Sequence, residues 1–317
     1  MKKIILTLGF AFIFSQIVIQ PGYGCYLCGL GEPIYWHNGK SISLQTESRA
    51  EPRAIAVYDS NVYIAGRVVE KPVYWLNGRR VALPYNGDMA WANAIAISAS
   101  DFYIVGVEFT GLGEDDPCTA VYWLNGICVA LPKTGDFASA NAVAISGSDV
   151  YIAGGDGGNA VYWLNGIQTV LPKTGRSASA NEIVVSGSNV YIAGRDGDDA
   201  VYWLNGIQTV LPKTGRYASA TAIAVSGSNV YVAGSDGDEA VYWANGRRIV
   251  LPGSGRFASA NAIAVSGSNV YIAGYDGYNA VYWLNGRRIV LPNRNALANG
   301  IAVSESNVYL TGIDSRQ

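Results

Sequence analysis

Apolar and polar residues alternate in short runs along most of the chain, with the period of two that is typical of half-buried β-strands. Four kinds of run recur, and examples are NAIAVS (261–266), NVYIAG (269–274), AVYWL (200–204) and IQTVLP (207–212). Ser and Gly residues join the first run to the second, and Asn-Gly joins the third to the fourth, as in a type I′ hairpin. Because connections this short force antiparallel neighbours, the pattern predicts a repeating four-stranded antiparallel unit.

This unit repeats at an interval near forty residues, and residues 160–176 and 200–216 are identical. Its two aromatic positions each occur seven times: a tryptophan after a tyrosine at Trp36, Trp75, Trp123, Trp163, Trp203, Trp243 and Trp283, and a tyrosine at Tyr63, Tyr103, Tyr151, Tyr191, Tyr231, Tyr271 and Tyr309. A period near forty that is rich in β-branched and aromatic residues is typical of β-propeller blades. Aromatic residues at regular strand positions are then expected to fill the core between blades.

The two ends of the chain complement each other. Only a third and a fourth run precede the first complete unit (residues 33–44), and only a first and a second run follow the last one (residues 299–310). Joined in one sheet, these halves make a blade and leave no open edge between the termini. The sequence therefore predicts an all-β domain over residues 25–317, a seven-bladed β-propeller of four-stranded antiparallel blades with one composite blade.

Two repeat families share these strings. NVYIAGRDG (189–197), followed by Tyr-Trp, resembles a Kelch repeat, although the paired glycines of that family occur here only as Gly154 and Gly155. The string A-x-x-W-x-N-G, followed by a leucine and by A-x-A-I, is more similar to the bacterial extracellular HAF-type repeats. This resemblance covers residues 33 to 312 and implies a secreted propeller-like array, without a general activity.

The first 24 residues have the pattern of a secretory signal peptide, with Lys2 and Lys3, a nearly unbroken apolar run from Ile4 to Ile19, and small residues before a cut after Gly24. The run is shorter than the ~20 residues of a membrane span. We therefore expect an extracytoplasmic protein, whether secreted, periplasmic or attached to the surface. Cys25 would then begin the mature chain and resembles the lipid-modified cysteine of bacterial lipoproteins, so the only membrane attachment considered is such a lipid anchor.

The composition of the chain limits which kinds of partner are expected. Half of the residues are apolar, 15% are charged, and the net charge of −2 comes without any basic run, so nucleic acid is not an expected partner. Cys25 and Cys28 lack a second pair at metal spacing, and no cofactor is expected. The four cysteines allow three disulfide pairings. A bridge between Cys28 and Cys118 is one expectation, because both should lie near the variable end, whereas Cys128 follows the opposite turn and should lie opposite Trp123. We expect a monomer.

Loops at one end of the propeller vary, whereas the Ser-Gly-Ser-Asn and Asn-Gly turns at the other end are nearly uniform. On the variable face an Asp-Gly pair recurs, and an arginine recurs between blades. These residues either join neighbouring blades or surround the channel mouth with polar groups that bind a ligand. Trp91 stands where later units have serine, and residues 107 to 119 form an insertion. The predicted ligand contacts are Trp91, Asp196, Asp236, Asp276, Arg216 and Arg256.

These features favour a noncatalytic module that binds a glycan or an extracellular protein through the variable face. The single histidine, His37, lies beside a uniform turn, so a Ser-His-Asp site cannot be assembled. A polysaccharide-acting enzyme that uses only carboxylates, such as Asp196 and Asp236, stays open as an alternative, as does a purely structural scaffold.

Overall fold

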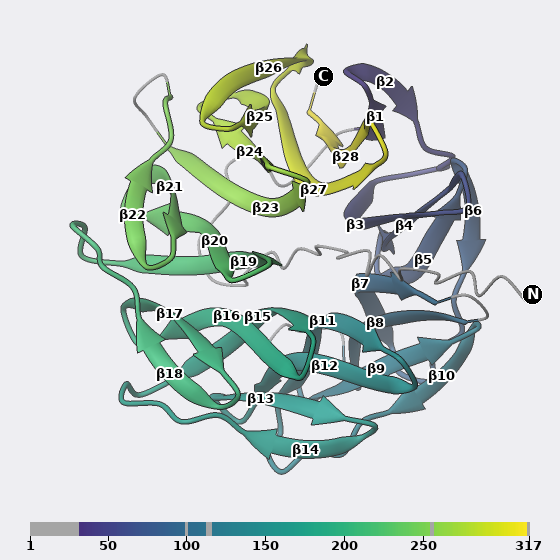
Figure 1. Cartoon of the computed structure of the whole chain (residues 1–317). Coiled ribbons are helices and arrows are strands. Elements are labelled where there is room, and N and C mark those ends of the chain that lie inside the picture. The colour runs from purple at the N-terminus through teal and green to yellow at the C-terminus, as the bar shows by residue number, and fades with distance from the viewer. Residues whose placement is uncertain (1–31, 99–100, 112–115, 254–256, 316–317) are drawn as a thin grey trace, which may run out of the picture.

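The computed structural model describes residues 32–98, 101–111, 116–253 and 257–315, and within them it contains strands and no helix. Seven four-stranded antiparallel sheets surround a central axis, so the predicted seven-bladed propeller is confirmed (Figure 1). The first strand of each blade is innermost and contacts the first strand of the next blade. No helix among the described residues is long and apolar enough to cross a membrane.

Blades are numbered here in chain order, and each complete blade uses four consecutive strands. Blade 1 contains β3 (Ala50–Tyr58), β4 (Asn61–Val68), β5 (Lys71–Leu76) and β6 (Arg79–Ala82). Blade 2 contains β7 (Met89–Ile97), β8 (Phe102–Phe109), β9 (Cys118–Leu124) and β10 (Ile127–Ala130). Blade 3 contains β11 (Ala138–Ser146), β12 (Asp149–Asp156), β13 (Asn159–Leu164) and β14 (Ile167–Val170).

Blades 4 to 6 repeat this arrangement with nearly constant strand lengths. Blade 4 contains β15 (Ala178–Ser186), β16 (Asn189–Asp196), β17 (Asp199–Leu204) and β18 (Ile207–Val210). Blade 5 contains β19 (Ala218–Ser226), β20 (Asn229–Asp236), β21 (Glu239–Ala244) and β22 (Arg247–Val250). Blade 6 contains β23 (Ala258–Ser266), β24 (Asn269–Asp276), β25 (Asn279–Leu284) and β26 (Arg287–Arg294).

Blade 7 is the composite blade and joins the two ends of the chain. Its strand order is β2 (Lys40–Ser43), β1 (Glu32–His37), β28 (Asn307–Asp314), β27 (Ala296–Ser304), as Figure 1 shows by the purple strands beside the yellow ones. In this sheet Trp36 lies opposite Leu310. The predicted closure is therefore confirmed, and it removes the free strand edge that an open ring would leave.

The turns at the uniform end are built as predicted. Asn165 and Gly166 have φ values of 50° and 83°, as the type I′ hairpin between β13 and β14 requires. The Asn165 side chain accepts a hydrogen bond from the Val150 N–H and donates one to Asp149 Oδ1, both at 2.9 Å. The two turns of the blade are thereby tied together, which explains why their sequences vary so little.

Every innermost strand contains a β-bulge, and the extra residue points its side chain at the next blade. In blade 3 the register shifts between Ala140 and Ala142, and Asn141 Nδ2 donates to Ala180 O of blade 4 at 2.9 Å. In blade 5 Thr221 does the same with its hydroxyl, at 2.6 Å from Ala260 O. The resulting ring of inter-blade hydrogen bonds starts from Arg53, Asn93, Asn141, Asn181, Thr221, Asn261 and Asn299.

The core lies between the blades. The seven repeated tryptophans are completely buried, as the sequence predicted. Six of the indole N–H groups donate to a backbone oxygen of the connection that enters their blade, and that of Trp36 donates to Asn293 Oδ1 of β26. Trp163 Nε1, for example, donates to Pro132 O at 2.9 Å. In blade 4 the fourth strand ends at Val210, before the predicted run does, and the next residue, Leu211, is buried.

The cysteines of blade 2 follow the predicted register. Cys128 lies opposite Trp123, Cys118 lies opposite Phe109, and no disulfide joins the two cysteines. The signal peptide, its cleavage site, Cys25 and Cys28 lie outside the described residues. Export, lipidation and a Cys28–Cys118 disulfide therefore stay predictions.

Candidate functional site

The predicted aspartates are buried where their strands end, with Asp196, Asp236 and Asp276 only 3%, 2% and 0% exposed. Asp196 Oδ2 accepts from Thr174 N at 2.6 Å and from Thr174 Oγ1 at 2.9 Å, and its Oδ1 accepts from Gly175 N at 2.7 Å. Thr174 and Gly175 belong to the connection that enters blade 4. The Asp196 carboxylate therefore fastens that connection to β16, the second strand of its blade.

The same arrangement recurs around the ring. Asp156 and Asp236 bind the corresponding threonine and glycine of their connections, and in blade 2 Glu108 binds the N–H groups of Asn86 and Gly87. Burial would raise the pKa of Asp156, Asp196 and Asp236, but hydrogen bonds from the connections and outer strands outweigh it and lower the pKa. These carboxylates are well suited to joining parts of the fold, and a ligand contact by them stays a prediction.

The arginines of the predicted set are placed differently. Arg216 is exposed, and its guanidinium carbon lies 5.0 Å from the centroid of the Tyr217 ring. Arg256 lies outside the described residues. Two of the buried aspartates form ion pairs with arginines of the outer strands instead, with Arg248 Nε 2.7 Å from Asp236 Oδ2 and Arg288 Nη2 2.6 Å from Asp276 Oδ2.

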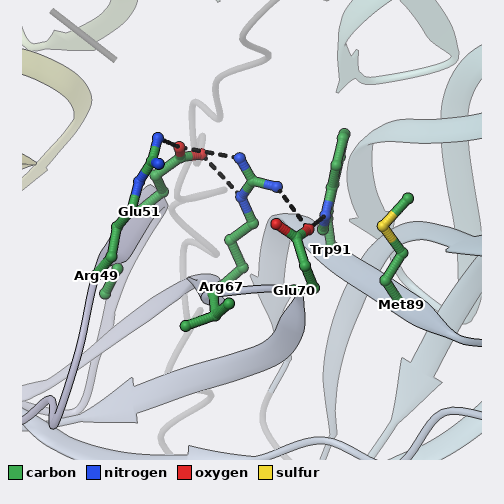
Figure 2. A pocket seen from close by; sticks show the side chains of 8 residues that line it. Arg49, Glu51, Arg67, Glu70, Met89 and Trp91 are labelled. Carbon is green, nitrogen blue, oxygen red and sulfur yellow. Dashed lines mark hydrogen bonds and ion pairs between the residues drawn. The ribbon is translucent and has the colours of Figure 1, made fainter. Parts of the chain in front are cut away.

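Trp91 lines a hollow at the variable end of the propeller, where the innermost strands of blades 1 and 2 begin (Figure 2). Its volume is about 530 Å³. The lining residues are Arg49, Ala50, Glu51, Arg67, Val69, Glu70, Met89 and Trp91. Of the predicted contacts, only Trp91 belongs to this group, which we call the blade 1–2 hollow.

Glu51 is the centre of the charge network in the hollow. Arg67 binds both of its oxygens, with Nε 2.9 Å from Oε2 and Nη2 3.0 Å from Oε1. Arg53 Nη2 lies 3.3 Å from Oε2, and Arg49 Nη2 lies 3.9 Å from Oε1. Burial would raise the pKa of Glu51, but the hydrogen bonds and charges of Arg67 and Arg53 outweigh it and lower the pKa, so Glu51 is ionised at neutral pH.

Trp91 holds two of these charged groups in place. Its Nε1 donates to Glu70 Oε2 at 3.0 Å, and the Arg67 guanidinium carbon lies 4.3 Å from its ring centroid, a cation–π contact. Arg67 Nη1 also binds Glu70 Oε2, at 3.1 Å. Figure 2 shows Arg67 between the two glutamates with Trp91 beside it. The Arg53 guanidinium carbon lies 5.2 Å from the same ring centroid, so two arginines contact the Trp91 ring.

The two breaks in the repeat that the sequence revealed meet at this hollow. Phe109, from the insertion at residues 107 to 119, packs against Trp91 with ring centroids 4.7 Å apart. Val69 lines the hollow with a φ of 54°, where blades 3 to 6 have glycine at Gly157, Gly197, Gly237 and Gly277. A β-branched residue in this conformation is strained, and such strain is concentrated at functional sites.

Sequence reasoning missed the charged residues that line the hollow, Arg49, Glu51, Arg67 and Glu70, and the buried Arg53 beside Glu51. A signal was present, because ESRAEPR (47–53) and RVVEKP (67–72) replace strings such as GRSASAN and RDGDDA of the regular blades. By strand register, Glu51 of blade 1 and Trp91 of blade 2 occupy the position of Ser179 in blade 4. Departures from the repeat in blade 1 thus mark the site as clearly as Trp91 does in blade 2.

Comparisons with known proteins give a fold likeness and no family. No protein-family model matches the chain, and no curated protein matches it. A solved structure described as "Structure of YjhT" is similar over 84% of this chain and 98% of that chain, with 11% sequence identity and a TM-score of 0.46. The propeller is shown, whereas the HAF-type or Kelch-like assignment stays a prediction.

Proposed function

We propose that this protein is an extracytoplasmic, noncatalytic binding module that holds a glycan in the blade 1–2 hollow. The observation that supports this most directly is the break in the repeat: charged residues, Trp91 and a strained Val69 occur together at one place on the variable face. Blades 3 to 5 keep the same strand lengths and the same latch, the aspartate that binds the connection entering its blade. A constant ring that carries one asymmetric hollow suits a scaffold with a single specific site.

The chemistry of the hollow suits a polyhydroxylated ligand. Arginine offers only donors and an ionised glutamate only acceptors, so Arg67 and Glu70 side by side can bind neighbouring hydroxyl groups. Trp91 supplies an apolar surface beside these polar groups. Their positions are fixed before a ligand arrives by the contacts among Arg67, Glu51, Glu70 and Trp91, which reduces the entropy lost on binding.

Noncatalytic binding is favoured over the carboxylate-dependent enzyme. A glycosidase needs one carboxylic acid that is protonated near neutral pH, which requires a raised pKa. Glu51, Asp196 and Asp236 all have lowered pKa values. The two aspartates are also buried against backbone N–H groups, which leaves their oxygens engaged.

The test is a screen of the mature protein against a glycan array and against captured extracellular proteins, followed by calorimetry on each hit. Trp91→Ala should weaken binding of the true ligand at least tenfold. Tyr58→Ala, on the opposite end of the same blade pair, is the matched control and should leave binding unchanged. Binding that Trp91→Ala leaves intact, or hits confined to proteins, would contradict the proposal, and turnover of a polysaccharide would favour the enzyme.

The proposal includes export by residues 1–24 and a monomeric mature chain, on the evidence of the signal-like N-terminal sequence. Intact mass of the protein from cells separates three outcomes: a chain that begins at Cys25, the same chain with a lipid adduct, and a chain that retains the leader. A retained leader would contradict export. Light scattering of the mature protein tests the monomer.

A further inference from the structure

We infer that the ligand of the blade 1–2 hollow carries a carboxylate, as in a glycan that contains uronic acid residues. This inference rests on the proposed function and specifies its ligand class. Its basis is the charge of the hollow and the geometry of the arginines around Glu51.

Among the described residues, the charged cluster in and next to the hollow has more positive than negative side chains. Of the residues that line it, Arg49 and Arg67 contribute two positive charges and Glu51 and Glu70 contribute two negative ones. Arg53 is not part of the lining and is buried, but it adds a third positive charge to the cluster, 3.3 Å from Glu51. This local excess contrasts with the whole chain, whose net charge is −2. A ligand with one negative charge would balance the cluster, since interactions in a partly enclosed hollow are less screened than on an open surface.

The positions of the arginines around Glu51 also favour a carboxylate on the ligand. Arg67 takes both oxygens of Glu51, so the other two guanidiniums approach this carboxylate at the longer distances of 3.3 Å and 3.9 Å. Arg49 lines the hollow, and its side chain is 47% exposed. Of the five N–H groups of Arg67, three are used by Glu51 and Glu70, which leaves two donors. Guanidinium groups in such positions match the two oxygens of a carboxylate.

Glu70 restricts the kind of acid. Its side chain is 47% exposed at the same hollow, where it can accept a hydrogen bond from a sugar hydroxyl but repels a second anion. A ring with one carboxylate and neighbouring hydroxyls fits both Arg49 and Glu70. A densely sulfated chain places further anions near Glu70 and fits less well.

The experiment is calorimetry of the mature protein with oligosaccharides of galacturonate, glucuronate and mannuronate, each paired with its carboxyl-reduced form, and with sulfated dextran oligosaccharides. At least one uronate should bind ten times more tightly than its reduced form, with an affinity that falls as salt rises. Arg49→Gln should remove most of that difference. Arg80→Gln, on the outer strand β6 of the same blade, is the matched control and should not change it.

The outcomes separate this inference from the proposed function. Equal binding of acidic and reduced forms, with both lost in Trp91→Ala, would overturn the carboxylate and leave glycan binding intact. Tighter binding of the sulfated chain than of any uronate would also overturn it. Absence of binding to every glycan, on the array as well as in calorimetry, would overturn both.

Discussion

The guanidinium of Arg67, on β4 of blade 1, lies 4.3 Å from the ring centroid of Trp91, on β7 of blade 2. This contact crosses a blade interface and shapes the hollow at the same time. Trp91 therefore contributes to stability as well as to the proposed binding site, and two substitutions separate its contributions to stability.

Trp91→Phe keeps an aromatic ring beside Arg67 but removes the N–H that donates a hydrogen bond to Glu70. Trp91→Ala removes the ring as well as the N–H. We expect the free energy of unfolding to fall by about 1 kcal/mol for the phenylalanine variant, the usual value of one hydrogen bond. We expect a fall of about 2–4 kcal/mol for the alanine variant, because packing and the cation–π contact are also lost. Urea unfolding measures both. Equal losses would show that the ring and its cation–π contact add nothing, and an unchanged phenylalanine variant would show that the N–H adds nothing.

Val69 provides a test of stored strain. Replacement by glycine, the residue of blades 3 to 6 at this place, should raise the free energy of unfolding by about 1 kcal/mol, because the left-handed conformation costs a β-branched residue about 1–3 kcal/mol and the glycine entropy offsets only part of that. Val69 is 51% exposed, so little packing is lost. Val81→Gly, on the outer strand of the same blade, should instead destabilise. A Val69→Gly protein that is less stable than the parent would contradict the strain.

The buried aspartates should matter for stability whether or not they contact a ligand. Asp196→Ala leaves the N–H groups of Thr174 and Gly175 without their acceptor and should cost about 2–3 kcal/mol. Asp198→Ala, two residues away on the exposed turn, should change stability by less than about 0.5 kcal/mol. If the two variants lost similar free energies of unfolding in thermal or urea unfolding, the role of Asp196 in fastening the connection would be refuted.

The same carboxylates predict a loss of stability in acid. The pKa values of Asp156, Asp196, Asp236 and Glu51 are lower in the folded protein than usual. Their contribution is therefore complete above the unfolded-state values near pH 4 and is lost as pH falls further, through the folded-state values. The urea midpoint should be level from about pH 7 to pH 5 and fall steeply below about pH 4. Asp196→Asn should make that fall shallower, and a midpoint that is insensitive to acid would contradict this origin.

Ring closure by blade 7 can be tested by deleting residues 300–317, which removes β28 and half of β27. Blade 7 would then lose the strand that pairs with β1, and the completely buried Trp36 would lose Leu310, which lies opposite it. We expect a lower unfolding midpoint and a broader transition. Deletion of residues 316–317 alone is the control, and an unchanged midpoint in the longer deletion would refute the closing role of these strands.

Much of the architecture could be predicted because it depends on local conformational preferences, and the same strand and turn sequences occur in every repeat. Asn165-Gly166 requires positive φ at both positions whatever surrounds it, and the alternation of β13 places Trp163 on a buried face. The half units at the two ends specified the composite blade, because neither half can complete a sheet alone. Because the pattern occurs seven times, a substitution in one blade does not hide the strands and turns that the other blades indicate.

The site needed the tertiary structure, because its residues come from three separate stretches: Glu51 from β3, Arg67 from β4 and Trp91 from β7. Sequence analysis found Trp91 as a departure from the repeat. It could not decide whether the aspartate of each Asp-Gly pair is exposed in a turn or buried against the connection, because the sequence is the same in both cases. Only the fold showed that Asp196 points toward Thr174 N rather than toward solvent, since that direction depends on where the preceding connection lies. By itself the sequence determined the strands, turns and blade number through local conformational preferences. Tertiary packing decided which charges meet, because Coulombic and hydrogen-bond energies depend on distances that one chain position cannot specify.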